Sequence, residues 1–247
     1  MKVSHIIIFP IKSLDPIKVK EAKINKEGGL EYDRLIAFFD PEGKILTKKR
    51  EKKLYKIRSN YDLDKFEVRL KVENLENTFS LEDINGLSQF MSDFLGYKVT
   101  AIKGYFPDSK DTPGPTIVST ETLKEVASWY GFSLEETRLR FRTNIEISAE
   151  YPFWEDRLCG SSFRIGSVEM KGVNISRRCN IPPADPFTGE RKENFENIFI
   201  EKRKRALPSW VREECMKGFY RLAINTTVPP SEKGKLIKEG DEIKVIS

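Results

Sequence analysis

The chain has 247 residues, of which 38% are hydrophobic and 33% charged, a composition that predicts a globular protein with a substantial core. A net charge of +5 suits an anionic ligand but falls short of the dense basic face that dedicated nucleic-acid binders carry. The single histidine, His5, lies in an apolar opening segment and argues against a Ser-His-Asp triad or a histidine-rich metal site.

The three cysteines are odd in number, widely separated and without a CxxC pair. This pattern predicts no disulfide framework and no zinc or iron–sulfur centre, and Cys159 is expected to be a small buried hydrophobe. The first apolar run ends at Pro10, and no apolar stretch approaches the ~18 residues of a membrane span. We therefore expect a cytoplasmic protein that has neither a membrane nor a nucleic acid as its partner.

The first hundred residues are patterned mainly as strands, at 3–9, 17–24 and 65–73, with a hairpin over 35–47. The last of these strands alternates apolar and charged residues cleanly. From Asp83 the apolar positions recur at helical spacing until Gly96, which predicts a helix there.

A strand is expected at 97–102, followed by a loop at 103–116 that is rich in proline and glycine. Helices are expected over 120–130 and from Ser133, where Ser133 and Glu136 form a capping box. Strands then follow at 144–148, 162–175, 220–228 and 241–247. The pattern predicts a mostly β fold with some helix (α+β), in two barrel-like domains at residues 1–105 and 106–247.

The segment ISRRCNIPPADPFTGE at 175–190 places a cysteine after two arginines in a chain stiffened by three prolines. Proline loses little conformational freedom on folding, so such a loop holds its shape at low cost. Rigid loops that carry a nucleophilic side chain favour a functional site. The alternative is a surface turn that contains a buried thiol.

Several short segments occur in a familiar order, namely FPIKSL, GLEYDR, DPEGKILTKKR, RFRTNIEIS, PFWED, FRIGSVEMKGV, RRCNIPPADPFTGE and IKEGDEIKV. In this order they resemble the two-domain MOSC proteins, in which an N-terminal MOSC β-barrel domain precedes the MOSC domain. The layout is most similar to the mitochondrial amidoxime-reducing components and their bacterial relatives. The resemblance covers nearly the whole chain.

The resemblance implies a molybdenum cofactor, a phosphate-bearing pterin dithiolene to which a protein cysteine adds a further molybdenum ligand. Here the matching cysteine is Cys179, a soft sulfur donor suited to that metal. Arg177 and Arg178 beside it favour the coordinating thiolate form. Asp185 matches an aspartate of the same family loop, where its role is either to steer protons near the metal or to hold the turn.

The family positions that contact the cofactor also carry over to this chain. Basic side chains suit its phosphate, and an alternating strand is expected to place Arg142 and Asn144 on one face. Simple helix capping is the alternative role of Ser119 and Thr120, and core packing that of Tyr220. The matching residues are Lys12, Ser13, Arg34, Ser119, Thr120, Arg142, Asn144 and Tyr220.

The function implied by the resemblance is that of a molybdenum-dependent oxidoreductase that reduces small N-hydroxylated substrates such as amidoximes and hydroxylamines. No ferredoxin-like cysteine cluster accompanies the motifs, so a separate protein is expected to donate the electrons. The alternative is a cofactor carrier or sulfur-transfer protein. Cofactor sulfurases contain a pyridoxal-phosphate region that this sequence lacks, which weakens this alternative. The basic run at 201–205 is expected to be a solvated helix face, with a docking patch for an acidic partner as its alternative.

Overall fold

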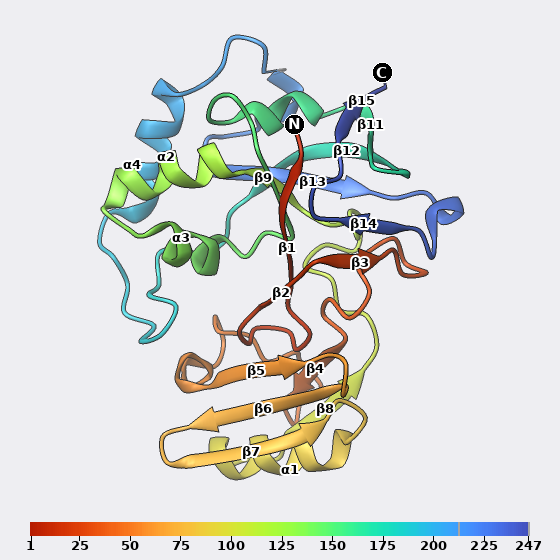
Figure 1. The fold of residues 1–247 in the computed structure, drawn as a ribbon. Coiled ribbons are helices and arrows are strands. Elements are labelled where there is room, and N and C mark those ends of the chain that lie inside the picture. Colours follow the sequence, from red (N-terminus) through yellow and green to blue (C-terminus); the bar gives the residue numbers. More distant parts are fainter. Residues whose placement is uncertain (212, 247) are drawn as a thin grey trace.

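The structure, a computed structural model, describes residues 1–211 and 213–246, which form two lobes (Figure 1). Its strands are β1 (Val3–Ile8), β2 (Ile17–Val19), β3 (Glu21–Lys23), β4 (Ile36–Phe39), β5 (Arg58–Asp62), β6 (Glu67–Val72), β7 (Leu75–Ser80), β8 (Thr100–Lys103), β9 (Ile117–Ser119), β10 (Ile145–Ile147), β11 (Ser162–Ile165), β12 (Val168–Arg177), β13 (Arg221–Thr227), β14 (Leu236–Lys238) and β15 (Ile243–Val245). Its helices are α1 (Ile84–Leu95), α2 (Thr120–Tyr130), α3 (Leu134–Phe141) and α4 (Phe195–Arg205), with short 3-10 helices η1 (Lys52–Lys56), η2 (Trp154–Leu158), η3 (Glu213–Cys215) and η4 (Pro230–Glu232).

The upper lobe in Figure 1 is built on an eight-stranded sheet in the order β15-β11-β12-β13-β9-β10-β1-β2. All neighbours are antiparallel except β9 and β10, which run parallel. The pair β14–β3 lies beside this sheet. The first strand of the chain therefore belongs to the sheet formed mainly by the second half of the chain.

The lower lobe combines the pair β4–β8, the meander β5-β6-β7 and helix α1. Strand β6 buries Val68, Leu70 and Val72 while its intervening residues face outward, because successive side chains of a strand point to opposite sides. Helix α1 begins at an N-cap, Asp83, whose carboxylate accepts a hydrogen bond from the Gly86 N–H at 2.8 Å. It ends at Gly96, whose φ of 83° suits the left-handed C-cap.

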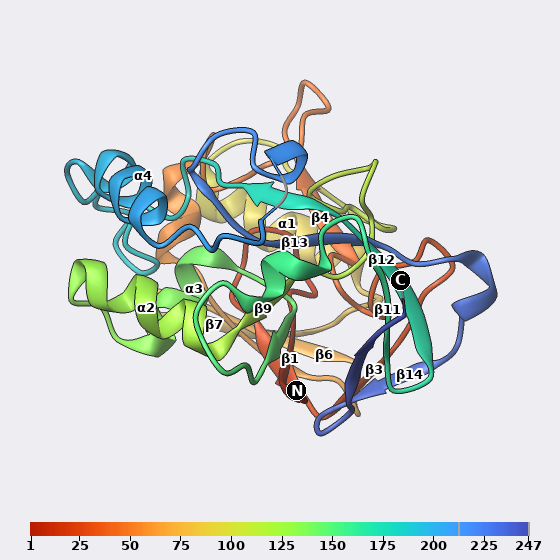
Figure 2. The ribbon, with the colours of Figure 1, turned by 90° about the horizontal axis from the view of Figure 1, so that it is seen from above.

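Helices α2, α3 and α4 gather at one side of the large sheet (Figure 2). Aromatic side chains fill the space between them and the sheet, among them Tyr130, whose ring stacks on Phe195 at 4.2 Å between centroids. Helix α3 is capped by Ser133, whose hydroxyl accepts from the Glu136 N–H at 3.0 Å. This is one half of the predicted capping box, because the Glu136 carboxylate accepts from Arg140 instead. The rigid end of α3 is one of the segments that position the site described below.

The predicted mixed fold class, mostly β with some helix, is confirmed. Within the described residues, however, the eight-stranded sheet does not close on itself, so the barrel-like expectation corresponds to an open, curled arrangement. The strands at 58–62 and 75–80 were not predicted from the sequence, and β7 is largely exposed, which leaves no buried alternation to recognise. The division of the chain at residue 105 stays a prediction, because β1 and β3 pair with strands of the other half.

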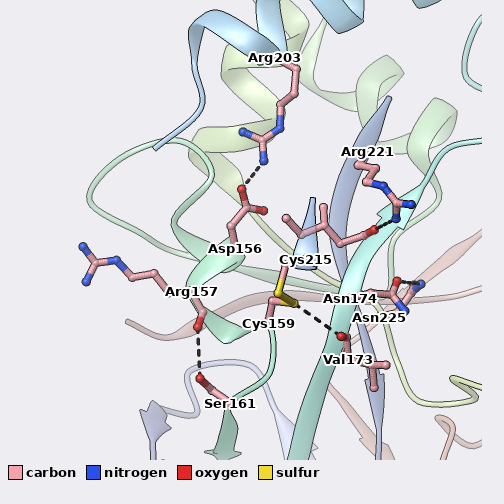
Figure 3. Close-up of a disulfide and its surroundings, with 11 residues drawn as sticks. Asp156, Arg157, Cys159, Ser161, Val173, Asn174, Arg203, Cys215, Arg221 and Asn225 are labelled. Carbon is pink, nitrogen blue, oxygen red and sulfur yellow. Dashed lines mark hydrogen bonds and ion pairs between the residues drawn. A yellow bond between two sulfur atoms is a disulfide. The ribbon is translucent and has the colours of Figure 1, made fainter. Parts of the chain in front are cut away.

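The expectation that the chain has no disulfide is wrong. Cys159, just after η2, is bonded to Cys215 at the end of η3, with 6.3 Å between the Cα atoms (Figure 3). Cys159 is buried as predicted, but as one half of a cross-link rather than as a small hydrophobe. The sequence separation of 56 hides the pairing, because β11, β12 and α4 lie between the two cysteines in the chain. Disulfides are uncommon in cytosolic proteins outside hyperthermophiles, so the cytoplasmic location stays a prediction.

The basic run 201–205 on α4 is a solvated face only in part. Lys202, Lys204 and Arg205 are exposed, whereas Arg203 is fully buried and forms an ion pair with Asp156 of η2 (Figure 3). Its guanidinium also lies over the Phe153 ring, 3.8 Å from the centroid. The helical period turns one residue of the run toward the core, and a carboxylate there provides the pairing that a buried charge requires.

In the described part of the chain, no helix has the length and apolar character that crossing a bilayer takes.

Candidate functional site

A cavity of about 700 Å³ opens between the two lobes, a size in the range of small-molecule binding sites. Its walls come from the segments after β1, before β4, between β8 and β9, after α3, and around the ends of β12 and β13. The lining is strongly basic. Its ten basic side chains are Lys12, Arg34, Lys48, Lys49, Arg140, Arg142, Arg177, Arg178, Lys217 and Arg221, against the acidic Asp33, Asp108 and Glu214.

Cys179 lies in this cavity, two residues beyond the end of β12, and is half-buried. It is a free thiol, since the other two cysteines are bonded to each other. The loop is anchored from below by Tyr220, whose hydroxyl donates to the Cys179 carbonyl at 3.3 Å. Further along, Arg140 donates to the carbonyls of Pro182 and Ala184 at 2.9 and 2.7 Å. The stiff loop thus presents its sulfur to the cavity from a fixed frame.

The two arginines before Cys179 differ in their surroundings. Arg177 is exposed at the cavity wall, while the guanidinium of Arg178 is turned inward and donates to the Phe141 carbonyl and, at 3.3 Å, to Ser176. Burial lowers the pKa of Arg178 from its usual value. Its Nε is buried without a hydrogen-bond partner among the described residues, so this arginine retains a free donor.

Lys12 and Arg34 enter the cavity from the first half of the chain and meet at one carboxylate, that of Asp108. Asp108 accepts from Lys12 Nζ at 2.7 Å and from Arg34 Nη2 at 2.9 Å. Arg34 also pairs with buried Asp33, and the two carboxylates raise the pKa of Arg34 although burial opposes its charge. Burial in turn raises the pKa of Asp33 despite the nearby arginine. Ser13 lines the same wall with a φ of 71° in the left-handed region.

Arg142 and Asn144 both line the cavity, but not from one strand as predicted. Arg142 is the C-cap of α3, with a φ of 51°, and Asn144 directly precedes β10. A helix end followed by a turn brings the two side chains to the same wall without strand alternation. The Arg142 guanidinium lies 4.1 Å from the centre of the Phe9 ring, and no carboxylate among the described residues forms an ion pair with it. Burial, and then the charge of Arg34, lower the pKa of Arg142 to about 10.

The amide of Asn144 is used within the protein. Its Nδ2 donates to the Ile7 carbonyl and to Asp33, each at 3.1 Å, and its Oδ1 accepts from the Thr116 N–H at 3.2 Å. Asn144 therefore ties the strand β1, the acidic residue beside Arg34 and the start of β9 into one network. Its contribution to the site in this structure is to hold the wall in place.

Four predicted residues lie outside the cavity lining. Ser119 is the N-cap of α2, with its hydroxyl accepting from the Thr122 N–H at 3.1 Å, and Thr120 donates to Glu146 at 2.7 Å. Ser119 therefore matches the capping alternative, whereas Thr120 pairs with a side chain of β10 instead. Asp185 accepts from the backbone N–H groups of Phe187 and Thr188 at 2.9 and 2.8 Å, which favours the turn-holding role.

Tyr220 is the fourth of these residues, and it packs edge-on against Phe199 at 5.2 Å between centroids. Its contact with the Cys179 carbonyl makes it a support of the loop rather than a part of the cavity wall. Core packing combined with one hydrogen bond is the role that its position favours.

Sequence reasoning missed three residues that shape the cavity, namely Asp33, Asp108 and Lys48. The sequence could have indicated the two aspartates, because Asp33 directly precedes the predicted site residue Arg34 and Asp108 lies in the predicted loop 103–116. Lys48 is one of several lysines in a basic run, and nothing in the sequence separates it from its exposed neighbours. Only the fold shows that Lys48 alone turns inward.

Comparison with known proteins supports the resemblance inferred from the motifs. Residues 1–105 match the family described as the MOSC N-terminal beta barrel domain. The molybdenum cofactor sulfurase of Danio rerio is 26% identical in an alignment that covers 77% of this chain and 29% of the relative. The human molybdenum cofactor sulfurase is 24% identical, over 82% of this chain and 28% of the relative. The chain thus spans less than a third of the length of these relatives.

Proposed function

We propose, from the match of residues 1–105 to the MOSC N-terminal beta barrel domain and the similarity to molybdenum cofactor sulfurases, that this chain binds the molybdenum cofactor and reduces N-hydroxylated compounds with it. The observation that carries the proposal is the meeting of a free thiol, Cys179, with the basic residues Lys12, Arg34 and Arg142 in one cavity. These residues come from four separate segments of the chain. A purely structural role does not explain why these cations lie together, because like charges that are buried close to one another destabilise the folded state.

The residues present fit a phosphate-bearing pterin that carries molybdenum. Lys12 and Arg34 already hold a carboxylate oxygen each at hydrogen-bond distance, so a phosphate has donors at the same place. Arg142 adds a cation without a carboxylate partner, and the buried Nε of Arg178 is a donor that no described residue satisfies. The thiol of Cys179 supplies a soft donor in the same cavity. The volume of about 700 Å³ leaves room for a substrate as well.

In the proposed reaction the cofactor supplies the redox chemistry that removes the substrate oxygen. Overall, an amidoxime takes up two electrons and two protons, its N–O bond breaks, and an amidine and water leave. Lys12, Ser13 and Arg34 would bind the phosphate, and Arg142 would orient the pterin from the facing wall. Cys179 would hold the metal at a fixed point, since its loop is anchored through Tyr220 and Arg140. The electrons would come from a separate donor protein.

A second candidate function is cofactor carriage or sulfur transfer without reductase activity. It is favoured by the similarity to molybdenum cofactor sulfurases, which extends over most of this chain. Here Cys179 would carry sulfur as a persulfide, a role that also needs an accessible free thiol. The same cavity would then hold the cofactor only transiently.

One experiment separates the two functions. The chain is produced in a molybdenum-competent host, and benzamidoxime is offered with viologen reduced by dithionite as electron donor. Formation of benzamidine by the wild type and its loss in a folded Cys179→Ser variant support the reductase. Bound cofactor that exchanges readily with no benzamidine formed, together with cyanide-labile sulfur on Cys179, supports the carrier instead.

A further inference from the structure

One lysine of the cavity, Lys48, has no role in the proposed function. This residue is only 7% exposed, yet it lines the cavity. Its Nζ lies 4.9 Å from the centre of the Tyr55 ring and 3.5 Å from the carbonyl of Pro186. Pro186 belongs to the loop that presents Cys179. Lys48, from the first half of the chain, therefore contacts the loop that carries the thiol.

Lys48 has no carboxylate partner among the described residues. Burial, and then the positive charge of Arg142, lower the pKa of Lys48 to about 7. Asp15 lies on the same side but is already engaged by Arg58 Nη1 at 3.1 Å and by the Ser59 N–H at 3.0 Å. Lysines are almost never buried without a partner, so this arrangement calls for an anion that the protein itself does not supply.

The phosphate of the proposed cofactor does not meet this need. Lys12 and Arg34, the donors proposed for the phosphate, lie by Asp108, whereas Lys48 contacts the Cys179 loop. Ten basic against three acidic lining residues leave the cavity strongly positive even after one phosphate has entered. An acidic protein surface cannot reach a buried ammonium group, so the remaining anion must be small enough to enter the cavity.

We propose that Lys48 is a specificity-determining residue that binds the carboxylate of an anionic N-hydroxylated substrate in the cavity that Cys179 also lines. The proposal rests on the reductase function and names the class of its substrate. Lys48 binds the anionic end and does not touch the N–O bond. An ammonium–carboxylate pair shielded from bulk water gives selectivity, because the neutral analogue leaves the ammonium unpaired.

The test compares 4-carboxybenzamidoxime with benzamidoxime, which differ by the carboxylate alone. Dissociation constants are measured by calorimetry on the cofactor-loaded chain at pH 6.5, and KM values with reduced viologen as donor. We expect the wild type to bind the carboxylated compound about tenfold more tightly, which is the usual scale of one charge-assisted hydrogen bond. Lys48→Met should remove that ratio, and Lys48→Arg should retain it. Lys52→Met, which changes an exposed lysine nearby, should leave the ratio as in the wild type.

Equal affinities of the wild type for the two compounds would overturn the proposal, as would an unchanged ratio in Lys48→Met. Because calorimetry measures binding whether or not the compound is reduced, the test of the anion site does not depend on the proposed reaction. If neither compound is reduced while the carboxylated one still binds selectively through Lys48, the reductase function fails and the anion site stands. If both are reduced with equal KM and equal affinity, the function stands and the anion site fails.

Discussion

The Nζ of Lys12 lies 2.7 Å from Oδ1 of Asp108, and this ion pair fixes the loop between β8 and β9 to Lys12. The family resemblance assigns the same lysine to the phosphate of the cofactor. The other oxygen of Asp108 takes Arg34 in the same way. The carboxylate thus occupies the donors that a phosphate would use. A ligand phosphate must displace the Asp108 carboxylate, and this displacement lowers the net affinity of the site for phosphate.

Replacing Asp108 by Asn should strengthen phosphate binding, because a neutral amide competes far less for Lys12 and Arg34. We expect inorganic phosphate to bind the cofactor-free chain about tenfold more tightly in Asp108→Asn, as measured by calorimetry. Asp111→Asn, in the same loop and with its side chain exposed, serves as the control for the loss of one negative charge. Equal affinities in the two variants would show that Asp108 does not compete with phosphate.

The disulfide between Cys159 and Cys215 should contribute strongly to stability. It closes a loop with a sequence separation of 56 residues, and for a loop of such length the chain-entropy model gives about 4 kcal/mol. Cys159→Ser should lower the free energy of unfolding by that order, measured by urea denaturation without reductant. Adding dithiothreitol should bring the wild type to the same value and leave the variant unchanged. A wild type that is insensitive to reductant would mean that the bond does not form.

The buried pair of Arg203 and Asp156 makes α4 sensitive to a single residue of its basic run. Arg203→Met removes the partner of a fully buried carboxylate, and we expect a loss of about 3–5 kcal/mol in the free energy of unfolding. Lys202→Met, one residue earlier and exposed, should change it by less than about 0.5 kcal/mol. Similar effects of the two substitutions would restore the view of a uniformly solvated face.

Lys48 should make the stability of the chain depend on pH in a defined window. Burial is the main cause that lowers its pKa to about 7, with Arg142 and Arg58 adding to the shift and Asp15 opposing it. The unfolded chain, where a lysine titrates near ~10.4, binds more protons between these two values, so stability should rise with pH there. Urea midpoints at pH 6.5 and 9.5 should show a gain in the wild type that is smaller in Lys48→Met. Parallel gains would place the titration on other groups.

Local patterns in the sequence were enough to predict most elements of this fold. The alternation of Val68, Leu70 and Val72 and the helical spacing up to Gly96 each report a buried face, and both elements form as predicted. The disulfide and the inward turn of Arg203 escaped prediction because both depend on which segments meet in space. No local periodicity records that.

The candidate site shows the same limit more sharply. Motif order pointed to Lys12, Arg34, Arg142 and Cys179, and the structure brings these four into one cavity. Ser119 was placed with them by the same resemblance and because a helix N-terminus suits an anion, but in the structure it caps its own helix. Charge pairing such as that of Asp108 requires the folded chain, since the loop that carries it lies far from Lys12 in the sequence.

The central claim is that the thiol of Cys179 and the basic cavity around it hold a molybdenum cofactor. The most direct measurement is the metal content of the purified chain from a molybdenum-competent host, combined with X-ray absorption at the molybdenum edge. The account predicts molybdenum equimolar with the chain, and one sulfur ligand fewer in Cys179→Ser than in the wild type. A folded wild-type chain without molybdenum, or a metal with the same sulfur ligands in both proteins, would contradict it.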